Sequence, residues 1–245
     1  MKTIIHIGQH QTATTSIQHF LKDKRKLLKK TGLYVPTMIA GYDNPAHFIL
    51  DVYALDQNRF SARKEQIIEE RGWTYLDSLE AKLHRDIKQI YKNAATHDCD
   101  RVLWSDAGLY LLNSESEYQK LKALFSDYCD EVEVVCCFRD VRAFRDSYIS
   151  QLFQQHLTQS QDADSYRYVG TDSWLFDYDL KKQLLEKVFD HCTYFQYDAD
   201  DNVKMFLQTI GYEETTGTQK YRRNVTANNH DLRHKIITRF SSLVH

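Results

Sequence analysis

Proline and glycine are scarce in this chain of 245 residues, which contains two prolines, Pro36 and Pro45, and eight glycines. Because both residue types interrupt helices, their scarcity predicts long helices joined by short connections. The chain also lacks internal repeats, low-complexity tracts and any linker rich in serine and proline. We therefore expect one domain that spans residues 1–245.

Long apolar runs are absent as well, so the sequence predicts no signal peptide and no membrane span. The formal net charge of −2 offers no general attraction to nucleic acid or to an anionic membrane, so a bound anion needs a local site. The five cysteines are scattered, odd in number and without metal-type spacing, and the histidines form no HExxH pattern. This usage predicts reduced thiols, a cytoplasmic protein and no metal site.

Short segments rich in β-branched and aromatic residues predict buried strands at 3–8, 101–106, 132–139 and 193–198. Helical patterns separate them. Apolar residues recur every three or four positions over 61–98, with an expected break near Gly72, and further helices are predicted over 114–128, 174–192 and 201–212. This alternation predicts a three-layer α/β fold with a mostly parallel central sheet.

The segment HIGQHQTATTSIQHFL, residues 6–21, reads as a strand, a turn and a helix. Backbone N–H groups, threonine hydroxyls and a helix N-terminus would then converge on one point, an arrangement that favours an anion. An unoccupied, threonine-rich helix start is the alternative interpretation. The pattern G-x-x-x-x-G-K-[ST] is missing, so the segment does not indicate ATP hydrolysis.

A second segment, VVCCFRDVRAFRDSYISQ at 134–151, ends a predicted strand at Arg139 and continues as a helix. Arg139 and Ser147 lie eight positions apart, so both side chains are expected to reach one phosphate. For Arg142 and Arg145 we instead expect a solvated helix face shared with acidic neighbours.

Together the two segments resemble sulfotransferases that use 3′-phosphoadenosine 5′-phosphosulfate (PAPS), including bacterial carbohydrate-type members. HIGQHQTATTSIQHFL is similar to their 5′-phosphosulfate loop, and FRDVRAFRDSYISQ to their 3′-phosphate motif. KDKRKLLKKTGLYVP, NPAHFIL, RVLWSDAGL and YRRNVTANN follow in the order found in that family. The resemblance implies a P-loop NTPase-like sulfotransferase fold, with PAPS as donor and a saccharide or other small molecule as the hydroxyl acceptor.

The resemblance also implies a role for each matching residue. The loop residues expected to contact the donor's 5′ end are Gln11, Thr12, Ala13, Thr14 and Thr15. The residues expected at its 3′-phosphate are Arg139 and Ser147, with Arg222 and Arg223 covering the same nucleotide.

Two positions depart from the family pattern. Gln11 stands where the family has lysine, and Ala107 stands where many relatives have glutamate. His10 either supplies the missing positive charge when protonated or is a neutral turn residue. Asp106 either replaces the glutamate or caps the following turn.

His47 is the other candidate for the general base, the alternative being a buried histidine with a structural hydrogen bond. Three functions follow: an active sulfotransferase, which we favour; a relative that binds the nucleotide or a partner without turnover; and a phosphate-loop kinase, which the missing lysine and glycines disfavour.

Overall fold

The computed structural model describes residues 1–9, 12–198, 200–213 and 217–221. His10, Gln11, Arg222 and Arg223, which the sequence suggests as site residues, lie outside these ranges. Five strands form a parallel sheet in the order β2-β5-β1-β6-β7. They are β1 (Lys2–Gly8), β2 (Leu33–Tyr34), β5 (Arg101–Ser105), β6 (Glu131–Phe138) and β7 (His191–Gln196).

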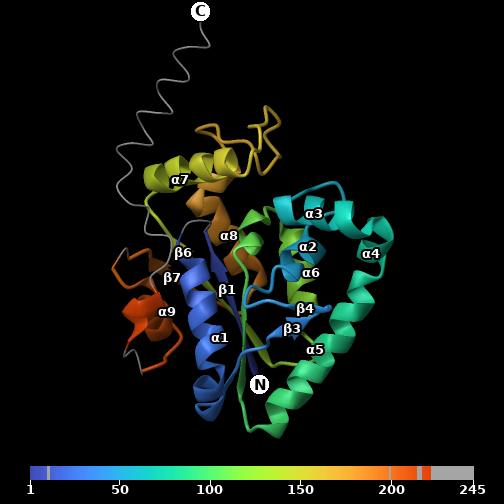
Figure 1. Ribbon diagram of the computed structural model, residues 1–245, viewed down its shortest axis with the longest axis vertical. Helices are drawn as coiled ribbons and strands as arrows, with labels where there is room; N and C mark the ends of the chain where they lie inside the picture. The colour runs from blue at the N-terminus through green and yellow to red at the C-terminus, as the bar shows by residue number, and fades with distance from the viewer. Residues whose placement is uncertain (10–11, 199, 214–216, 222–245) are drawn as a thin grey trace, which may run out of the picture.

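The helices connect these strands and cover both faces of the sheet (Figure 1). They are α1 (Thr14–Lys30), α2 (Ile49–Ala54), α3 (Ala62–Arg71), α4 (Trp73–Asp77), α5 (Leu79–Thr96), α6 (Glu115–Ala123), α7 (Val141–Gln154), α8 (Tyr178–Val188) and α9 (Asn202–Thr209). The short elements are η1 (Gly108–Leu111), η2 (Trp174–Phe176), η3 (Thr218–Tyr221) and an antiparallel pair, β3 (Met38–Ile39) with β4 (Tyr42–Asp43). The predicted α/β class is therefore confirmed.

Each face of the sheet has its own apolar cluster, because side chains alternate along a strand. Ile4 and Val135 pack with α1 and α9 on one face. Ile5 and Val134 pack in the larger cluster on the opposite face, which includes residues of α2, α5, α6 and α8. Buried strands with helices on both sides explain why the strand sequences are nearly continuous apolar runs.

The direction in which the connections add strands to the sheet changes beside β1. The connection that follows β1 leads toward β2 at one edge, whereas the connection that follows β6 leads to β7 at the other. In parallel α/β sheets, ligands bind at the carboxyl ends of the strands where the order reverses in this way. The loops after β1 and β6 are therefore the expected place for a ligand.

The predicted strands and long helices agree with the structure to within a few residues, but α2, β2 and the β3–β4 pair have no predicted counterpart, and the helix predicted over 174–192 ends at Val188, before β7. The interruption near Gly72 is confirmed, since Gly72 has a φ of 73° between α3 and α4. The edge strand β2 was not predicted, because it has only two residues. None of the helices within the described ranges is long and apolar enough to cross a membrane.

Candidate functional site

The loop after β1 is tied to the loop after β6 by a buried glutamine. Gln9 is 0% exposed, and its Oε1 accepts the backbone N–H of Arg139 at 2.7 Å. Its Nε2 donates to the Tyr110 hydroxyl at 3.0 Å. Because Gly8 is paired with Cys137 in the sheet, Gln9 and Arg139 leave neighbouring strand ends at nearly the same height. The two phosphate-binding segments predicted from sequence therefore lie side by side.

Hydrogen bonds to backbone groups hold the start of α1 in place. The Thr12 N–H and hydroxyl both donate to the carbonyl oxygen of Gln9, at 3.2 and 2.7 Å. The Thr12 carbonyl accepts from Nδ2 of Asn202 at 2.7 Å. Ala13 then adopts a left-handed conformation with φ 56° and ψ 23°, which costs a non-glycine residue about 1 kcal/mol. A tightly bonded loop compensates for such local strain.

Two loop threonines bring hydroxyls to the N-terminus of α1. Thr14 is buried, its Oγ1 lies 3.4 Å from that of Thr12, and a Cβ added at Gly8 would come within 2.1 Å of it. Glycine at position 8 is thus required by the close approach of the threonine. Thr15 is exposed. No acidic residue occurs in the first turn of α1, so the helix dipole there is not offset by a local negative charge.

Arg139 and Ser147 contact each other, as their spacing suggests. Nη1 of Arg139 donates to the serine hydroxyl at 2.9 Å, and the guanidinium lies 5.1 Å from the centre of the Tyr197 ring. The Arg139 carbonyl accepts from the Tyr178 hydroxyl at 2.8 Å. The arginine is half-buried and positioned from several sides, which favours a fixed anion contact.

The other two arginines of this segment differ from each other. Arg142 is exposed, in agreement with a solvated helix face. Arg145 is half-buried, and its Nε donates to the carbonyl oxygen of Val169 at 2.9 Å. The prediction of a solvated position was therefore wrong for Arg145, which fastens the segment after α7 to the helix.

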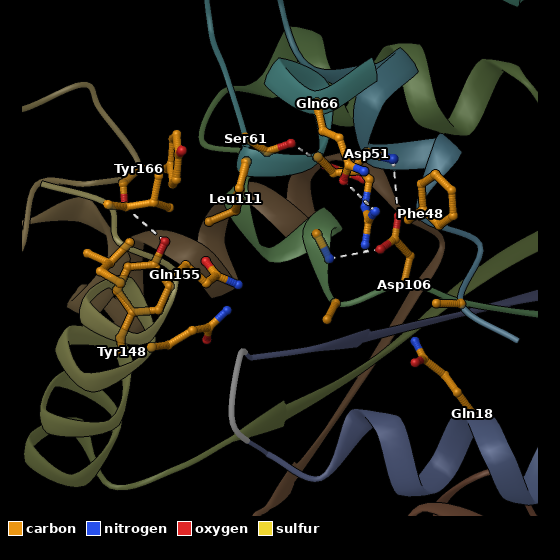
Figure 2. A pocket seen from close by; sticks show the side chains of 18 residues that line it. Gln18, Phe48, Asp51, Ser61, Gln66, Asp106, Leu111, Tyr148, Gln155 and Tyr166 are labelled. Carbon is orange, nitrogen blue, oxygen red and sulfur yellow. Dashed lines mark hydrogen bonds between the residues drawn. The ribbon is translucent and has the colours of Figure 1, made fainter. Parts of the chain in front are cut away.

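A cavity of about 410 Å³ lies beside this region (Figure 2). Its walls come from α1, α2, α3, η1, α7 and the segment after α7. Gln18 of α1 and Tyr148 of α7 both line it, and each follows closely on a residue of the phosphate-binding segments, Thr14 and Ser147 respectively. The cavity therefore shares two helices with the predicted nucleotide site.

Two buried aspartates line this cavity. Asp106 is 2% exposed, its Oδ1 accepts the N–H of Gly108 at 2.8 Å, and its Oδ2 accepts the N–H of Asp51 at 3.1 Å. Burial, together with the nearby Asp51 carboxylate, raises the pKa of Asp106 well above its usual range. Burial also raises the pKa of Asp51 to about 7. The contact with Gly108 caps the turn after β5. Because Asp106 also lines the cavity, it remains a candidate for a catalytic role.

His47 is buried and has both ring nitrogens bonded to the backbone. The N–H of Ser105 donates to Nδ1 at 2.9 Å, so Nε2 carries the proton and donates to the carbonyl oxygen of Pro36 at 3.1 Å. Burial lowers the pKa of His47 to about 4. A histidine held in this way joins the chain before α2 to β5, and it would have to break one of these bonds to take a proton.

Asp51 is not among the site residues predicted from the sequence. The sequence nevertheless contains an indication of a site, because Asp51 is the one charged residue within the apolar stretch from Phe48 to Leu55. A charge inside a helix that is otherwise buried requires either a partner or a function.

Among the described residues, no group of three or more His, Cys, Asp or Glu side chains is arranged to hold a metal ion.

Comparisons with known proteins agree with this fold. No protein-family model matches the sequence, and no curated protein matches it. The crystal structure of a sulfotransferase from Alicyclobacillus acidocaldarius is similar, with a TM-score of 0.50 and 13% sequence identity, over 99% of this chain and 92% of that chain. The chain therefore has a sulfotransferase-like fold; at this identity the similarity extends to the fold alone.

Proposed function

We propose that this protein transfers a sulfuryl group from PAPS to a hydroxyl group of a saccharide or other small acceptor. The observation that supports this most directly is the junction made by Gln9, through which two phosphate-binding segments 130 residues apart adjoin at neighbouring strand ends. A doubly phosphorylated nucleoside needs two anion-binding groups at a fixed separation, and the sulfotransferase-like fold supplies the setting.

Each segment is suited to one phosphate. Thr14 and Thr15 provide hydroxyls at the N-terminus of a helix of 17 residues, next to Thr12, whose hydroxyl holds the loop through the Gln9 carbonyl oxygen, and we assign the three residues to the 5′-phosphate. Arg139 and Ser147 provide a cation and a hydroxyl already in contact, and we assign them to the 3′-phosphate. Ala13, at the turn between Thr12 and Thr14, contributes its backbone. Arg222 and Arg223 remain predictions from the sequence for the same nucleotide.

The cavity is suited to the acceptor. Four glutamine side chains line it, and amide groups both donate to and accept from hydroxyls. These glutamines are Gln18, Gln66, Gln151 and Gln155. Aromatic rings of Phe48, Tyr148 and Tyr166 line the same cavity and offer apolar faces of the kind on which a sugar ring packs. Asp106 and Asp51 supply the carboxylates that a general base requires.

The transfer itself places demands on the loop after β1. When the acceptor oxygen attacks sulfur, the bond from sulfur to the bridging oxygen breaks and negative charge develops on the 5′-phosphate. Gln11 offers hydrogen bonds without a charge at the position of the family's lysine, and loss of a charged donor costs on the order of 3 kcal/mol of transition-state stabilisation. We expect a slow enzyme, with protonated His10 as a further source of charge.

Two measurements on the wild-type protein test the proposal. Adenosine 3′,5′-bisphosphate should raise the melting temperature, because a ligand that binds only the folded state stabilises it. Incubation with PAPS labelled in the sulfuryl group, over a panel of saccharides, should transfer the label to an acceptor. A thermal shift without any transfer would support binding without turnover, and no thermal shift at saturating ligand would contradict both.

A further inference from the structure

Asp51 carries an oxygen that the fold leaves without a partner. Its side chain is 1% exposed, and Oδ1 has no hydrogen bond within the part of the chain that the structure describes. Oδ2, in contrast, accepts from the Ser61 hydroxyl at 2.8 Å. An unpaired buried carboxylate oxygen is costly, so its retention points to a partner that arrives with a ligand.

The carboxyl group of Asp51 is held against the turn that carries Asp106. The Asp51 N–H donates to Asp106 Oδ2, and a Cβ added at Gly108 would lie 2.5 Å from Cγ of Asp51. Glycine at position 108 thus lets the two acidic residues approach each other. Figure 2 shows both side chains among those that line the cavity, with Ser61 bonded to Asp51.

The two acidic residues differ in which oxygens are in use. Both oxygens of Asp106 already accept backbone N–H groups. Asp51 has one oxygen bonded to Ser61 and one without a partner among the described residues. An incoming hydroxyl group therefore finds its free acceptor on Asp51.

Few charged groups face this pair. From α3, Arg63 and Lys64 act on Asp51, but Lys64 donates to the carbonyl oxygens of Asp56 and Arg59 at 2.7 and 2.8 Å. Arg63 lies over the Phe48 ring at 4.6 Å. The neighbouring titratable groups are the neutral His47 before α2, Tyr148 of α7 and Tyr166 after it, and burial raises the pKa of both tyrosines.

We propose that Asp51 is the catalytic base of the transfer and that Asp106 is a positioning residue, whose carboxyl group holds the Asp51 N–H and so fixes the start of α2. This inference rests on the proposed function. The acceptor hydroxyl donates a hydrogen bond to Oδ1 of Asp51 and passes its proton to that oxygen. The acceptor oxygen forms the new bond to sulfur, the bond from sulfur to the bridging phosphate oxygen breaks, and its electron pair stays on the phosphate. Asp51 then releases the proton to water.

Asp51→Asn is the first test. Asparagine has the same shape, its carbonyl oxygen still accepts from Ser61, and its amide replaces only the unpaired oxygen, so the variant is expected to fold. We expect transfer to fall by about 10²- to 10⁴-fold, the usual contribution of a general base. The thermal shift with adenosine 3′,5′-bisphosphate should stay unchanged. Transfer equal to that of the wild type would overturn the base role of Asp51.

Asp106→Asn is the matched variant, because it removes one of the two oxygens that accept backbone N–H groups and keeps Asp51. The wild-type rate should rise with pH to a plateau with a midpoint near 7, where Asp51 loses its proton. In Asp106→Asn the plateau rate should fall while the midpoint stays near 7, because the raised pKa of Asp51 comes from burial and Asp106 only holds its backbone. An unchanged plateau rate would contradict the positioning role.

A direct titration does not depend on activity or on the second variant folding. Carboxyl ¹³C chemical shifts of labelled aspartates should show one group titrating near pH 7 in the wild type, and this signal should be missing in Asp51→Asn. If every aspartate of the wild type titrates below pH 5, the pair does not exist as described. If the pair titrates as expected but no acceptor is sulfated at any pH, the proposed function fails and the base role fails with it.

Discussion

The predicted nucleotide side and the acidic cavity differ in the residue types that form them. On the nucleotide side, short threonine and serine side chains, a helix N-terminus and one arginine lie at the ends of adjoining strands. On the cavity side, two carboxyl groups are buried, and they accept hydrogen bonds from backbone N–H groups and a serine. The first side is prepared to receive negative charge, and the second is prepared to take up a proton.

The difference shows how one sheet edge supports two kinds of chemistry. Helix dipoles and arginine stabilise an anion, so the phosphate groups need little burial. Desolvation raises the pKa of a carboxyl group, so the base needs to be buried. Helices α1 and α7 contribute residues to both sides, so the two sides adjoin.

On the nucleotide side, the largest effect is expected from Arg139→Ala. Removing the guanidinium should weaken binding of adenosine 3′,5′-bisphosphate by about 100-fold, since hydrogen bonds to charged groups contribute about 1.5–3 kcal/mol. Isothermal titration calorimetry would measure this change. Arg142→Ala, an exposed arginine of the same helix, is the matched control and should retain nearly full affinity. Similar losses in both variants would remove the distinction between a specific contact and general attraction.

Gln11→Lys is expected to act in the opposite direction. Restoring a charged donor should raise the transfer rate by about 10- to 100-fold, because the charge meets the negative charge that develops on the leaving phosphate. Rates measured with labelled PAPS would show the gain, and Gln11→Met, a substitution of similar size without charge, should show none. A lysine variant that binds the nucleotide but remains inactive would favour a protein without turnover.

Gln9→Ala should loosen the junction between the loops after β1 and β6. The substitution leaves the buried N–H of Arg139 without its acceptor, which should lower the free energy of unfolding by about 2 kcal/mol. Chemical denaturation would measure the loss, with Gln119→Ala at an exposed helix position as the control. Because Arg139 would lose the side-chain acceptor that holds its backbone N–H, nucleotide affinity should fall as well. Stability and affinity that both stay unchanged would contradict this account of the junction.

A further effect concerns the pH dependence of stability in Asp51→Asn. Burial raises the pKa of Asp51 to about 7 from 3.8, so between these values the folded protein holds a proton that the unfolded chain has lost. The carboxyl therefore makes the wild type progressively less stable as pH rises from about 4 to 7. The variant should gain stability relative to the wild type across that window, on the order of 3 kcal/mol.

Denaturation at several pH values would measure this difference, with the exposed Asp127→Asn as the control for loss of a surface charge. Comparing variant with wild type removes the opposing contributions of His6 and His47, whose pKa values are lowered by burial to about 3 and about 4. A difference that does not change between pH 4 and 7 would show that Asp51 ionises normally in the folded protein.

Much of the fold followed from local patterns. The strands β1, β5, β6 and β7 each occupy a run of β-branched and aromatic residues, and the helices between them follow the three-to-four residue period. The approach of Arg139 to Ser147 was also predictable, since a spacing of eight on a helix keeps both near one strand end. The two-residue strand β2 was not, because so short a segment carries no period.

What the sequence determined by itself is the order of the elements and the residues at the strand ends, because periodicity, capping and turn chemistry act over a few positions. The tertiary structure decided which side chains lost contact with water. Packing between Ser105 of β5 and the carbonyl oxygen of Pro36 bonded both nitrogens of His47, and the approach of α2 to Gly108 brought Asp51 to Asp106. Desolvation depends on segments distant in the chain, so only the folded molecule could set the protonation of these groups.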